Sequence, residues 1–307
     1  MTASLEQACL RRLTEDHPEL AGKPIRVVSS GHQNVVVVVD ETYVFRFPRT
    51  EDLSSLRLEQ RLLPKLGEVL PVGIPQFEFA SGPKEKPVYV GYPILRGKTL
   101  ERSVLESFSD ATQLRLAQGI AGFLSALHQF QDDELVQCTN RDRRACRAEW
   151  RRNWSGYYRA VEQIVFPRLH TRERTWIMEV FHAYLYPEEH FEFRPCLIHG
   201  DFKNDHILVN AQGRMTGVID FGQLKIGDPS YDYHDLYLTY GEPFAELVYK
   251  LYTGPHDPTF LSRCKQFYTH IIRFSSLINS IQSGDKAKFE RRLEWLRKMA
   301  RGSEAER

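Results

Sequence analysis

The stretch "LIHGDFKNDHILVN" (residues 197–210) places two histidines, two aspartates, a lysine and two asparagines directly behind a short apolar run. A second stretch, "GVIDFGQLKIGDPSYD" (residues 217–232), follows after six residues. In each, an apolar segment runs into a carboxylate beside a glycine, which places the carboxylate at a strand end where it can meet a substrate. Asp201 and Asp220 flank a predicted hairpin, so we expect the two carboxylates to meet in one site.

The spacing of these residues is typical of a phosphoryl-transfer site. Such a site has His-x-Asp, a polar metal ligand five residues later, and Asp-Phe-Gly after a hairpin. One carboxylate accepts the proton of the attacking hydroxyl, while the second holds Mg²⁺ on the nucleotide phosphates with its hard oxygen atoms. We therefore expect Asp201 to be the base and Asp220 the main metal ligand. The polar ligand would be His206, where protein kinases carry asparagine; a neutral imidazole nitrogen can also coordinate a metal.

Composition narrows the class of protein. The chain has 307 residues, 42% hydrophobic and 26% charged, which fits one large domain or two lobes with a cleft. Its 41 basic and 40 acidic residues leave a net charge of +1, which favours no nucleic-acid partner. Five cysteines without a CxxC pair fit a reducing compartment. The charged amino terminus is unlike a signal peptide, and no apolar run is long enough to span a membrane, so we expect a cytoplasmic protein.

The order of predicted elements gives the fold class. A helix at 5–17 precedes β-rich segments at 25–28, 35–39 and 43–47, a helix at 53–63 that stops at Pro64, and two further strands at 75–80 and 88–95. A long helix at 109–130, a helical stretch at 141–176 and helices from about residue 243 follow the hinge near 92–97. We predict an α+β, bilobal fold with a small antiparallel amino-terminal lobe (1–96) and a larger, mostly helical lobe (97–307).

The two motifs together resemble the aminoglycoside phosphotransferase family, within the wider protein-kinase-like fold. The histidine at position 206 is similar to the 2''-phosphotransferase branch, where that position is also histidine. The motifs are long and specific, and a looser resemblance covers most of the chain from Ile25 on. The resemblance implies a monomeric enzyme that transfers the γ-phosphoryl group of ATP or GTP, with Mg²⁺, to a hydroxyl of a small molecule, an aminoglycoside.

The resemblance also implies roles for individual residues. Asp201 would be the base, and His206 and Asp220 the metal ligands. Arg46 stands where the family carries a phosphate-binding lysine, and Glu59, thirteen residues on, would be its helix partner. Arginine keeps the charge and the carboxylate pairing, although its fork differs from a point charge.

The nucleotide would lie between a glycine turn and the hinge. The turn "SSGHQN" (29–34), which includes Ser30, would cover the phosphates. At the hinge, Tyr92 would be the gatekeeper, with the Pro93 carbonyl and the Leu95 N–H as backbone partners of the purine. A bulky Tyr92 would also narrow the adenine pocket and favour guanine.

The sequence leaves the acceptor open. Residues 228–246 contain five acids and no lysine or arginine, which suits a polycationic substrate. We expect Asp232 and Glu242 to contact it. Asp228 and Asp232 are also expected to brace the catalytic loop or cap the next helix. Conversely, residues 141–174 carry ten arginines and four acids. If this segment lines the cleft, it would suit an anionic or neutral acceptor; alternatively, it is a solvated helix face.

Three other interpretations remain. The same chemistry could serve another acceptor, such as a macrolide, a sugar, an amino alcohol or homoserine. A metal-dependent hydrolase would use His199, Asp201, His206 and Asp220 as ligands. A pseudokinase would bind nucleotide without turnover. His199 and His128 are otherwise expected to be buried structural histidines, and the aromatic residues 150, 154, 157 and 158 to be packing residues.

Overall fold

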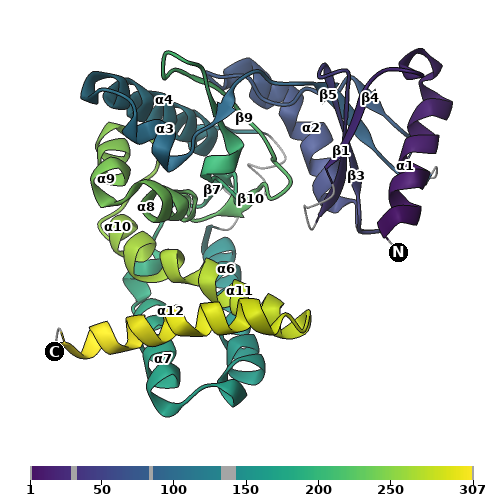
Figure 1. Cartoon of the computed structure of the whole chain (residues 1–307). Coiled ribbons are helices and arrows are strands. Elements are labelled where there is room, and N and C mark those ends of the chain that lie inside the picture. Colours follow the sequence, from purple (N-terminus) through teal and green to yellow (C-terminus); the bar gives the residue numbers. More distant parts are fainter. Residues whose placement is uncertain (1, 29–32, 83–85, 133–142, 306–307) are drawn as a thin grey trace. The chain divides into compact units, whose positions relative to one another are not determined.

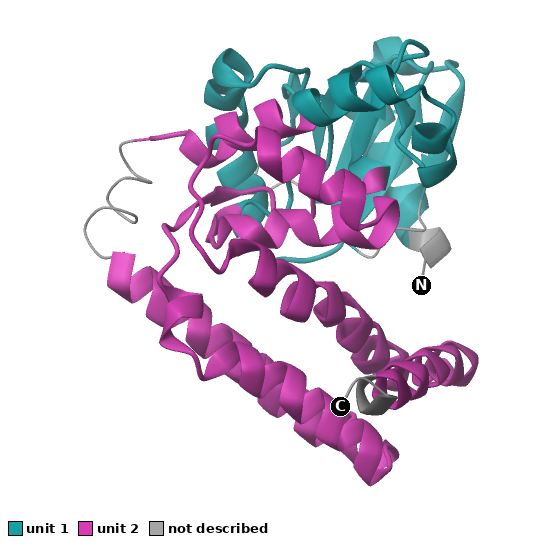
Figure 2. Ribbon diagram, turned by 90° about the vertical axis from the view of Figure 1, so that its left-hand side faces the viewer, with its two compact units in different colours: residues 1–119, 205–224 teal, residues 120–204, 225–307 magenta. Residues whose placement is uncertain are grey.

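The computed structural model describes residues 2–28, 33–82, 86–132 and 143–305, with side chains for 5–28, 33–82, 86–132 and 143–302. These residues pack into two compact units, coloured separately in Figure 2. Unit 1 comprises Met1–Gly119 and Asp205–Leu224, and unit 2 comprises Ile120–Asn204 and Lys225–Arg307. The lobe boundary that we predict between residues 96 and 97 stays a prediction. The two compact units are divided differently, with residues 97–119 and 205–224 grouped with the amino-terminal strands.

Unit 1 contains the predicted antiparallel sheet. Its five strands are β1 (Ile25–Val28), β2 (Asn34–Val39), β3 (Tyr43–Pro48), β4 (Phe79–Ala80) and β5 (Val90–Pro93), in the order β1-β2-β3-β5-β4 (Figure 1). Val35, Val37 and Val39 alternate along β2 and are fully buried, as period-two patterning requires. The strands expected at 25–28, 35–39 and 43–47 are therefore confirmed, whereas the segments at 75–80 and 88–95 form shorter strands than expected.

Helix α2 (Ser54–Val69) follows β3, and the prediction that it stops at Pro64 is wrong. Pro64 lies inside the helix, although an interior proline costs about 3 kcal/mol because it removes one backbone hydrogen bond. The apolar period continues past it, since Leu62, Leu63 and Leu66 are fully buried. Gln60, whose carbonyl loses its partner, is exposed to water. Burial of the second half of the helix offsets the local defect.

The remainder of unit 1 is a second, smaller sheet with short helices. Strands β6 (Lys98–Thr99), β8 (Ile207–Val209) and β9 (Met215–Val218) pair antiparallel in the order β6-β8-β9. The β8–β9 pair is the hairpin predicted between the two motifs. Helix α1 (Thr2–Asp16) precedes β1, α3 (Arg102–Glu106) follows β6, and α4 (Asp110–Gln129) contributes residues to both units.

Unit 2 is predominantly helical. Its helices are α6 (Arg143–Ile164), α7 (Thr171–Leu185), α8 (His234–Tyr240), α9 (Glu242–Leu251), α10 (Phe260–Arg263), α11 (Thr269–Gln282) and α12 (Lys286–Ala305). A π-helical turn, Cys264–Tyr268, joins α10 to α11, and α12 packs against α11 and α7. The two-stranded sheet of β7 (Cys196–Ile198) and β10 (Lys225–Gly227) carries the sequence motifs. The helical stretch expected at 141–176 is two helices, separated by a 3-10 turn at Phe166–Arg168.

The α+β class is confirmed, with antiparallel strands early in the chain and helices later (Figure 1). Aromatic side chains dominate the core of unit 2, where Trp150 is buried and its Nε1 donates to the Tyr268 hydroxyl at 2.9 Å. The four aromatic residues of α6 pack in this core, as expected. Among the residues described, no helix combines the length and apolarity needed to cross a lipid bilayer.

Candidate active site

Arg46 and Glu59 form a buried ion pair in unit 1. Arg46 lies on β3 and Glu59 on α2, and the guanidinium donates to both carboxylate oxygens, at 2.7 and 3.3 Å. The two side chains are only 7% and 2% exposed. The pairing that the family resemblance implied is therefore present, in the two-pronged geometry that arginine allows and lysine does not.

Arg46 remains a cation in this environment. Burial alone would disfavour its charge, but the carboxylate of Glu59, with smaller contributions from Tyr92 and Asp220, raises the pKa of Arg46 above its ordinary value. Burial also raises the pKa of Tyr92 to about 12, so its phenol stays neutral. A fixed positive charge thus stands beside a neutral aromatic side chain.

His206 and Asp220 stand together near Arg46. His206 Nε2 lies 3.6 Å from Asp220 Oδ2, and Arg46 Nη2 lies 3.6 Å from Asp220 Oδ1. His206 is the last residue of a 3-10 turn (Asn204–His206) that leads into β8, while Asp220 lies two residues beyond β9, so the hairpin brings them together. One imidazole nitrogen and one carboxylate oxygen at this separation can both reach a single hydrated cation, which fits the chemistry expected of Mg²⁺ ligands.

The backbone of Asp220 has a left-handed conformation, with φ of +64°. Residues other than glycine, asparagine and aspartate rarely adopt this conformation. It is found at functional turns where the surrounding structure enforces it. The N–H of the preceding Ile219 donates to the His206 carbonyl at 3.0 Å, which ties the backbone of the two side chains together.

A pocket of about 300 Å³ in unit 1 collects five of the residues predicted from the sequence. These are Arg46, Tyr92, Leu95, His206 and Asp220. Most of the remaining lining is aliphatic, from β2, β3, β5 and the hairpin: Val36, Val38, Val44, Ile94, Leu208 and Ile219. An apolar pocket whose lining also includes charged groups suits a ligand with an aromatic base and an anionic tail.

The strand register shows which hinge groups face away from β3. Residues 42 and 94 pair through the Ile94 N–H, which donates to the Thr42 carbonyl at 2.7 Å, and Val44 pairs with Tyr92. Backbone groups alternate along a strand, so those of Pro93, the last residue of β5, point to the opposite edge. Strand β4 reaches only as far as Gly91 on that edge. The Pro93 carbonyl therefore lies past the end of β4, and the contact of the Leu95 N–H with a purine stays a prediction.

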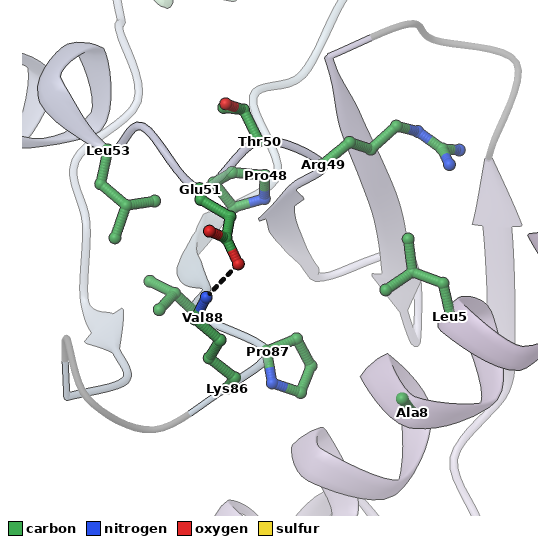
Figure 3. A pocket seen from close by; sticks show the side chains of 10 residues that line it. All are labelled: Leu5, Ala8, Pro48, Arg49, Thr50, Glu51, Leu53, Lys86, Pro87 and Val88. Carbon is green, nitrogen blue, oxygen red and sulfur yellow. Dashed lines mark hydrogen bonds and ion pairs between the residues drawn. The ribbon is translucent and has the colours of Figure 1, made fainter.

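A second pocket in unit 1, of about 350 Å³, lies between α1 and the loop that leads to α2 (Figure 3). Leu5 and Ala8 line it from the helix, and Lys86 pairs with Glu51 at 2.8 Å. None of the residues predicted for the active site lines it. Ser30, which was expected to contact phosphate, lies outside the described residues.

In unit 2, Asp201 follows β7 at the end of a loop held by hydrogen bonds. The side chain of Asp201 is 35% exposed, and the Lys203 ammonium lies 3.2 Å from Asp201 Oδ2. The backbone N–H of Asp201 donates to His199 Nδ1 at 3.3 Å, and His199 is fully buried. His199 is thus buried within the loop, as expected of a structural residue.

Asp232 is enclosed in the protein, which does not suit the substrate contact that we predicted for it. Its side chain is fully buried, and its oxygens accept from the backbone N–H groups of His199 (2.7 Å) and Gly200 (2.8 Å). His128 Nε2 lies 3.1 Å from the same carboxylate. Burial by itself would raise the pKa of Asp232, but these partners hold it below its usual value. The geometry supports the other role we expected, the bracing of the Asp201 loop.

The other acids of residues 228–246 are also engaged within unit 2. Asp228 accepts from the fully buried Arg263 at 2.6 and 2.9 Å, and Asp235 accepts from the Asn204 N–H at 3.1 Å. Glu242, which we expected to contact the acceptor, pairs with Lys265, as does Glu246 at 2.6 Å. Glu242 remains 61% exposed, so its substrate contact stays a prediction. Arg263 was not predicted, because nothing in the local sequence "LSRCKQF" reveals partners as distant as Asp228.

Lys225 on β10 is a further cation near the Asp201 loop that the sequence did not single out. Its ammonium lies 5.0 Å from the ring centre of Tyr231 and 5.8 Å from that of Trp150. Burial lowers the pKa of Lys225, while the carboxylates of Asp232 and Asp201 act in the opposite direction. Two arginines of α6 serve the fold: Arg147 and Arg151 donate to backbone carbonyls of Phe193 and Leu185, both at 2.7 Å.

Comparison with known proteins identifies the family. A sequence model described as "Phosphotransferase enzyme family" matches residues 24–258. A 46-residue segment is 41% identical to the uncharacterized protein YcbJ of Bacillus subtilis (strain 168), a match that spans 15% of that protein's length.

Two solved structures are similar over nearly the whole chain. The GDP and kanamycin complex of APH(2")-IIia is 26% identical, with a TM-score of 0.83 over 96% of this chain and 98% of that one. The GDP complex of wild-type aminoglycoside 2'-phosphotransferase-IIIa is 27% identical, with a TM-score of 0.81 over the same shares. This similarity confirms the predicted family resemblance. The chain belongs to the phosphotransferase enzyme family and has its protein-kinase-like fold.

Proposed function

We propose that this chain transfers the γ-phosphoryl group of ATP or GTP to a hydroxyl of a small molecule, with Mg²⁺. One observation carries the proposal. A single pocket of unit 1 contains the buried Arg46 cation, held by Glu59, together with His206 and Asp220. Phosphoryl transfer passes through a loose transition state, so catalysis depends mainly on positioning and on neutralisation of charge, and these residues would provide both.

Phosphate and metal binding are assigned to unit 1. Arg46 would contact the phosphates, and Glu59 would fix the direction of its guanidinium. His206 and Asp220 would hold Mg²⁺, which when bound neutralises charge on the phosphate oxygens. The base would stack between the aliphatic side chains of the pocket, with Tyr92 selecting between adenine and guanine.

Asp201 would be the catalytic base. It would orient the acceptor hydroxyl and accept its proton, a contribution of roughly 10²–10⁴ in rate. Asp232 would position Asp201, since its carboxylate holds the backbone of residues 199 and 200, and the buried His128 would fix that carboxylate in turn. Free cysteines such as Cys9 and Cys264 support our expectation of a cytoplasmic enzyme, which we expect to act as a monomer.

Aminoglycosides are the first acceptor class that we propose. The support comes from the two similar solved structures, one of which contains kanamycin. Glu242 would be the acceptor contact contributed by this chain, exposed at the start of α9.

A less cationic acceptor is a second candidate, and the charges of unit 2 favour it. All five acids that suggested a polycation site have partners inside the unit, among them Arg263 and Lys265. Two lysines, Lys203 and Lys225, accompany Asp201. A sugar, an amino alcohol, homoserine or a macrolide would meet less repulsion there than a polycation.

The decisive experiment measures nucleoside diphosphate release with ATP or GTP and MgCl₂. The acceptor panel comprises kanamycin, gentamicin, a macrolide, simple sugars and amino alcohols. Stimulation by kanamycin or gentamicin would establish the first acceptor class, and stimulation by another compound alone would establish the second.

The Asp201→Asn variant completes the test. It should lose at least about 10²-fold in turnover while its nucleotide affinity stays near that of the wild type. Persistent turnover would show that Asp201 is not the base. Nucleotide binding without turnover by any acceptor would favour the pseudokinase, and a tightly bound transition metal in the purified protein would favour the hydrolase.

A further inference from the structure

Two glycines of unit 1 contact each other at a point where three segments meet. Gly73 lies in the loop between α2 and β4, and Gly217 lies in β9. Their backbones form a parallel bridge, in which the Gly73 N–H donates to the Thr216 carbonyl at 3.1 Å and the Val218 N–H donates to the Gly73 carbonyl at 3.0 Å. This bridge connects the loop after α2 directly to the strand that leads to Asp220.

The contact leaves no room for a side chain. A methyl group on Gly217 would lie 2.9 Å from the Gly73 carbonyl oxygen, and one on Gly73 would lie 3.2 Å from the Thr216 carbonyl oxygen. The obstacles are backbone atoms, which cannot rotate out of the way as a side chain can. An alanine at position 217 therefore requires the loop and the strand to separate by several tenths of an ångström.

The bridge closes a ring of contacts that includes the predicted metal ligand. From Asp220 the ring passes to Arg46 at 3.6 Å, then to Glu59 at 2.7 Å on α2. It continues along α2 into the loop, crosses the bridge from Gly73 to β9, and returns to Asp220 through Val218 and Ile219. Every part of this ring lies in unit 1.

Leu95 lies against both glycines from the pocket side. Its two methyl groups would be 3.4 and 3.5 Å from methyl groups built on Gly73 and Gly217, and its side chain lines the pocket. These are close to ordinary van der Waals distances, so the strain of an added methyl group falls on the bridge, which sets the distance between the loop after α2 and β9.

We propose that Gly73 and Gly217 are positioning residues that hold Asp220 at the correct distance from Arg46 and the metal. The inference rests on the proposed function, in which Asp220 binds Mg²⁺. Residues that orient metal ligands typically change metal affinity 10- to 100-fold when replaced. Because the displacement here is a fraction of an ångström, the lower end of that range applies.

The test measures binding of ADP and of GDP to the full chain by calorimetry over a series of MgCl₂ concentrations. We expect Gly217→Ala to raise the Mg²⁺ concentration needed for half-maximal tightening of nucleotide binding about 10-fold. Its nucleotide affinity without Mg²⁺ should stay within about 2-fold of the wild type. Gly73→Ala, with the longer approach, should shift the Mg²⁺ requirement about 3-fold.

Gly122→Ala, in helix α4, is the control, because apart from the adjacent backbone of its own helix nothing lies within 4 Å of the added methyl group. It should leave the Mg²⁺ requirement unchanged. Hydrogen exchange at the Val218 amide, which donates to Gly73, should accelerate in Gly217→Ala and not in Gly122→Ala.

The outcomes separate this inference from the proposed function. Wild-type nucleotide binding that does not respond to Mg²⁺ would overturn the metal assignment itself. A wild type that responds, with Gly217→Ala equal to Gly122→Ala within about 2-fold, would overturn only the role of the glycine pair. If Gly217→Ala does not fold, Gly73→Ala decides in the same way, since its approach is less severe.

Discussion

The Arg46–Glu59 pair allows a quantitative test of the amino-terminal unit. Glu59→Gln keeps the size of the side chain and removes its charge, which leaves the Arg46 cation buried without its main partner. Breaking a buried ion pair by removing one member costs about 3–5 kcal/mol. Asp220, 3.6 Å from Arg46 and 38% exposed, supplies a weaker replacement. We therefore expect a loss of about 3 kcal/mol in the free energy of unfolding of unit 1.

The chain contains a matched control with similar chemistry and different burial. Arg26 donates to Glu41 with N–O distances of 3.1, 3.1 and 3.2 Å, but these side chains are 55% and 67% exposed. An exposed pair contributes less than about 1 kcal/mol, so Glu41→Gln should change the free energy of unfolding by no more than that.

The assay must report on unit 1. All four tryptophans of the chain, at positions 150, 154, 176 and 295, lie in unit 2, so their fluorescence would miss the change. Hydrogen exchange of peptides from β3 and α2 gives the local free energy of opening directly. Equal losses in Glu59→Gln and Glu41→Gln, both below about 1 kcal/mol, would refute the argument that burial makes the first pair strong.

Three further predictions concern the pocket and a partly buried histidine. Tyr92→Ala should raise the ratio of kcat/KM for ATP to that for GTP about 10-fold, and an unchanged ratio would show that Tyr92 does not select the base. His206→Asn should keep its metal-binding ability, whereas His206→Phe should raise the Mg²⁺ requirement for nucleotide binding about 10-fold; equal behaviour of the two would exclude His206 as a ligand. Burial and nearby Arg273 lower the pKa of His270 to about 4, so its unfolded form binds a proton first as the pH falls. The contribution of His270 to the free energy of unfolding should be fully present above pH 6.5 and should fall by about 3 kcal/mol between pH 6.5 and pH 4, as measured by urea titration. His270→Phe should remove this fall, and a pH dependence that persists in that variant would show that other groups cause it.

Local patterning was sufficient for much of the fold. A run of consecutive valines between turn residues predicted β2, and apolar spacing predicted the helices, because both signals depend on neighbours in sequence. The stop at Pro64 failed because burial of Leu66 outweighs the local penalty, a tertiary effect that no local pattern contains. The Arg46–Glu59 pair was expected only because the two motifs resemble a known family, since no local pattern links a residue of β3 to one of α2.

Charge counting was less informative than position. Five acids without a lysine or arginine among them suggested a polycation site, yet their partners come from distant segments before and after them in the chain. Arg263 lies 35 residues after Asp228, and Lys265 lies 23 residues after Glu242. Burial of Asp232 likewise depends on β7 and α4, which bring His199 and His128 to it. Sequence proximity of like charges therefore says little about which of them are available to a ligand.

The positive φ of Asp220 restricts which experiments on that residue can be interpreted. A left-handed backbone costs most side chains about 1–2 kcal/mol, and asparagine and aspartate avoid much of this cost through local hydrogen bonds. Asp220→Ala would therefore alter the turn as well as remove the carboxylate, whereas Asp220→Asn preserves the turn and changes only charge. The positive φ therefore favours aspartate, asparagine or glycine at this position. The residues other than aspartate that this backbone favours would weaken or remove the metal ligand and leave the fold intact. A single substitution here could therefore convert an enzyme into a protein that only binds its ligands.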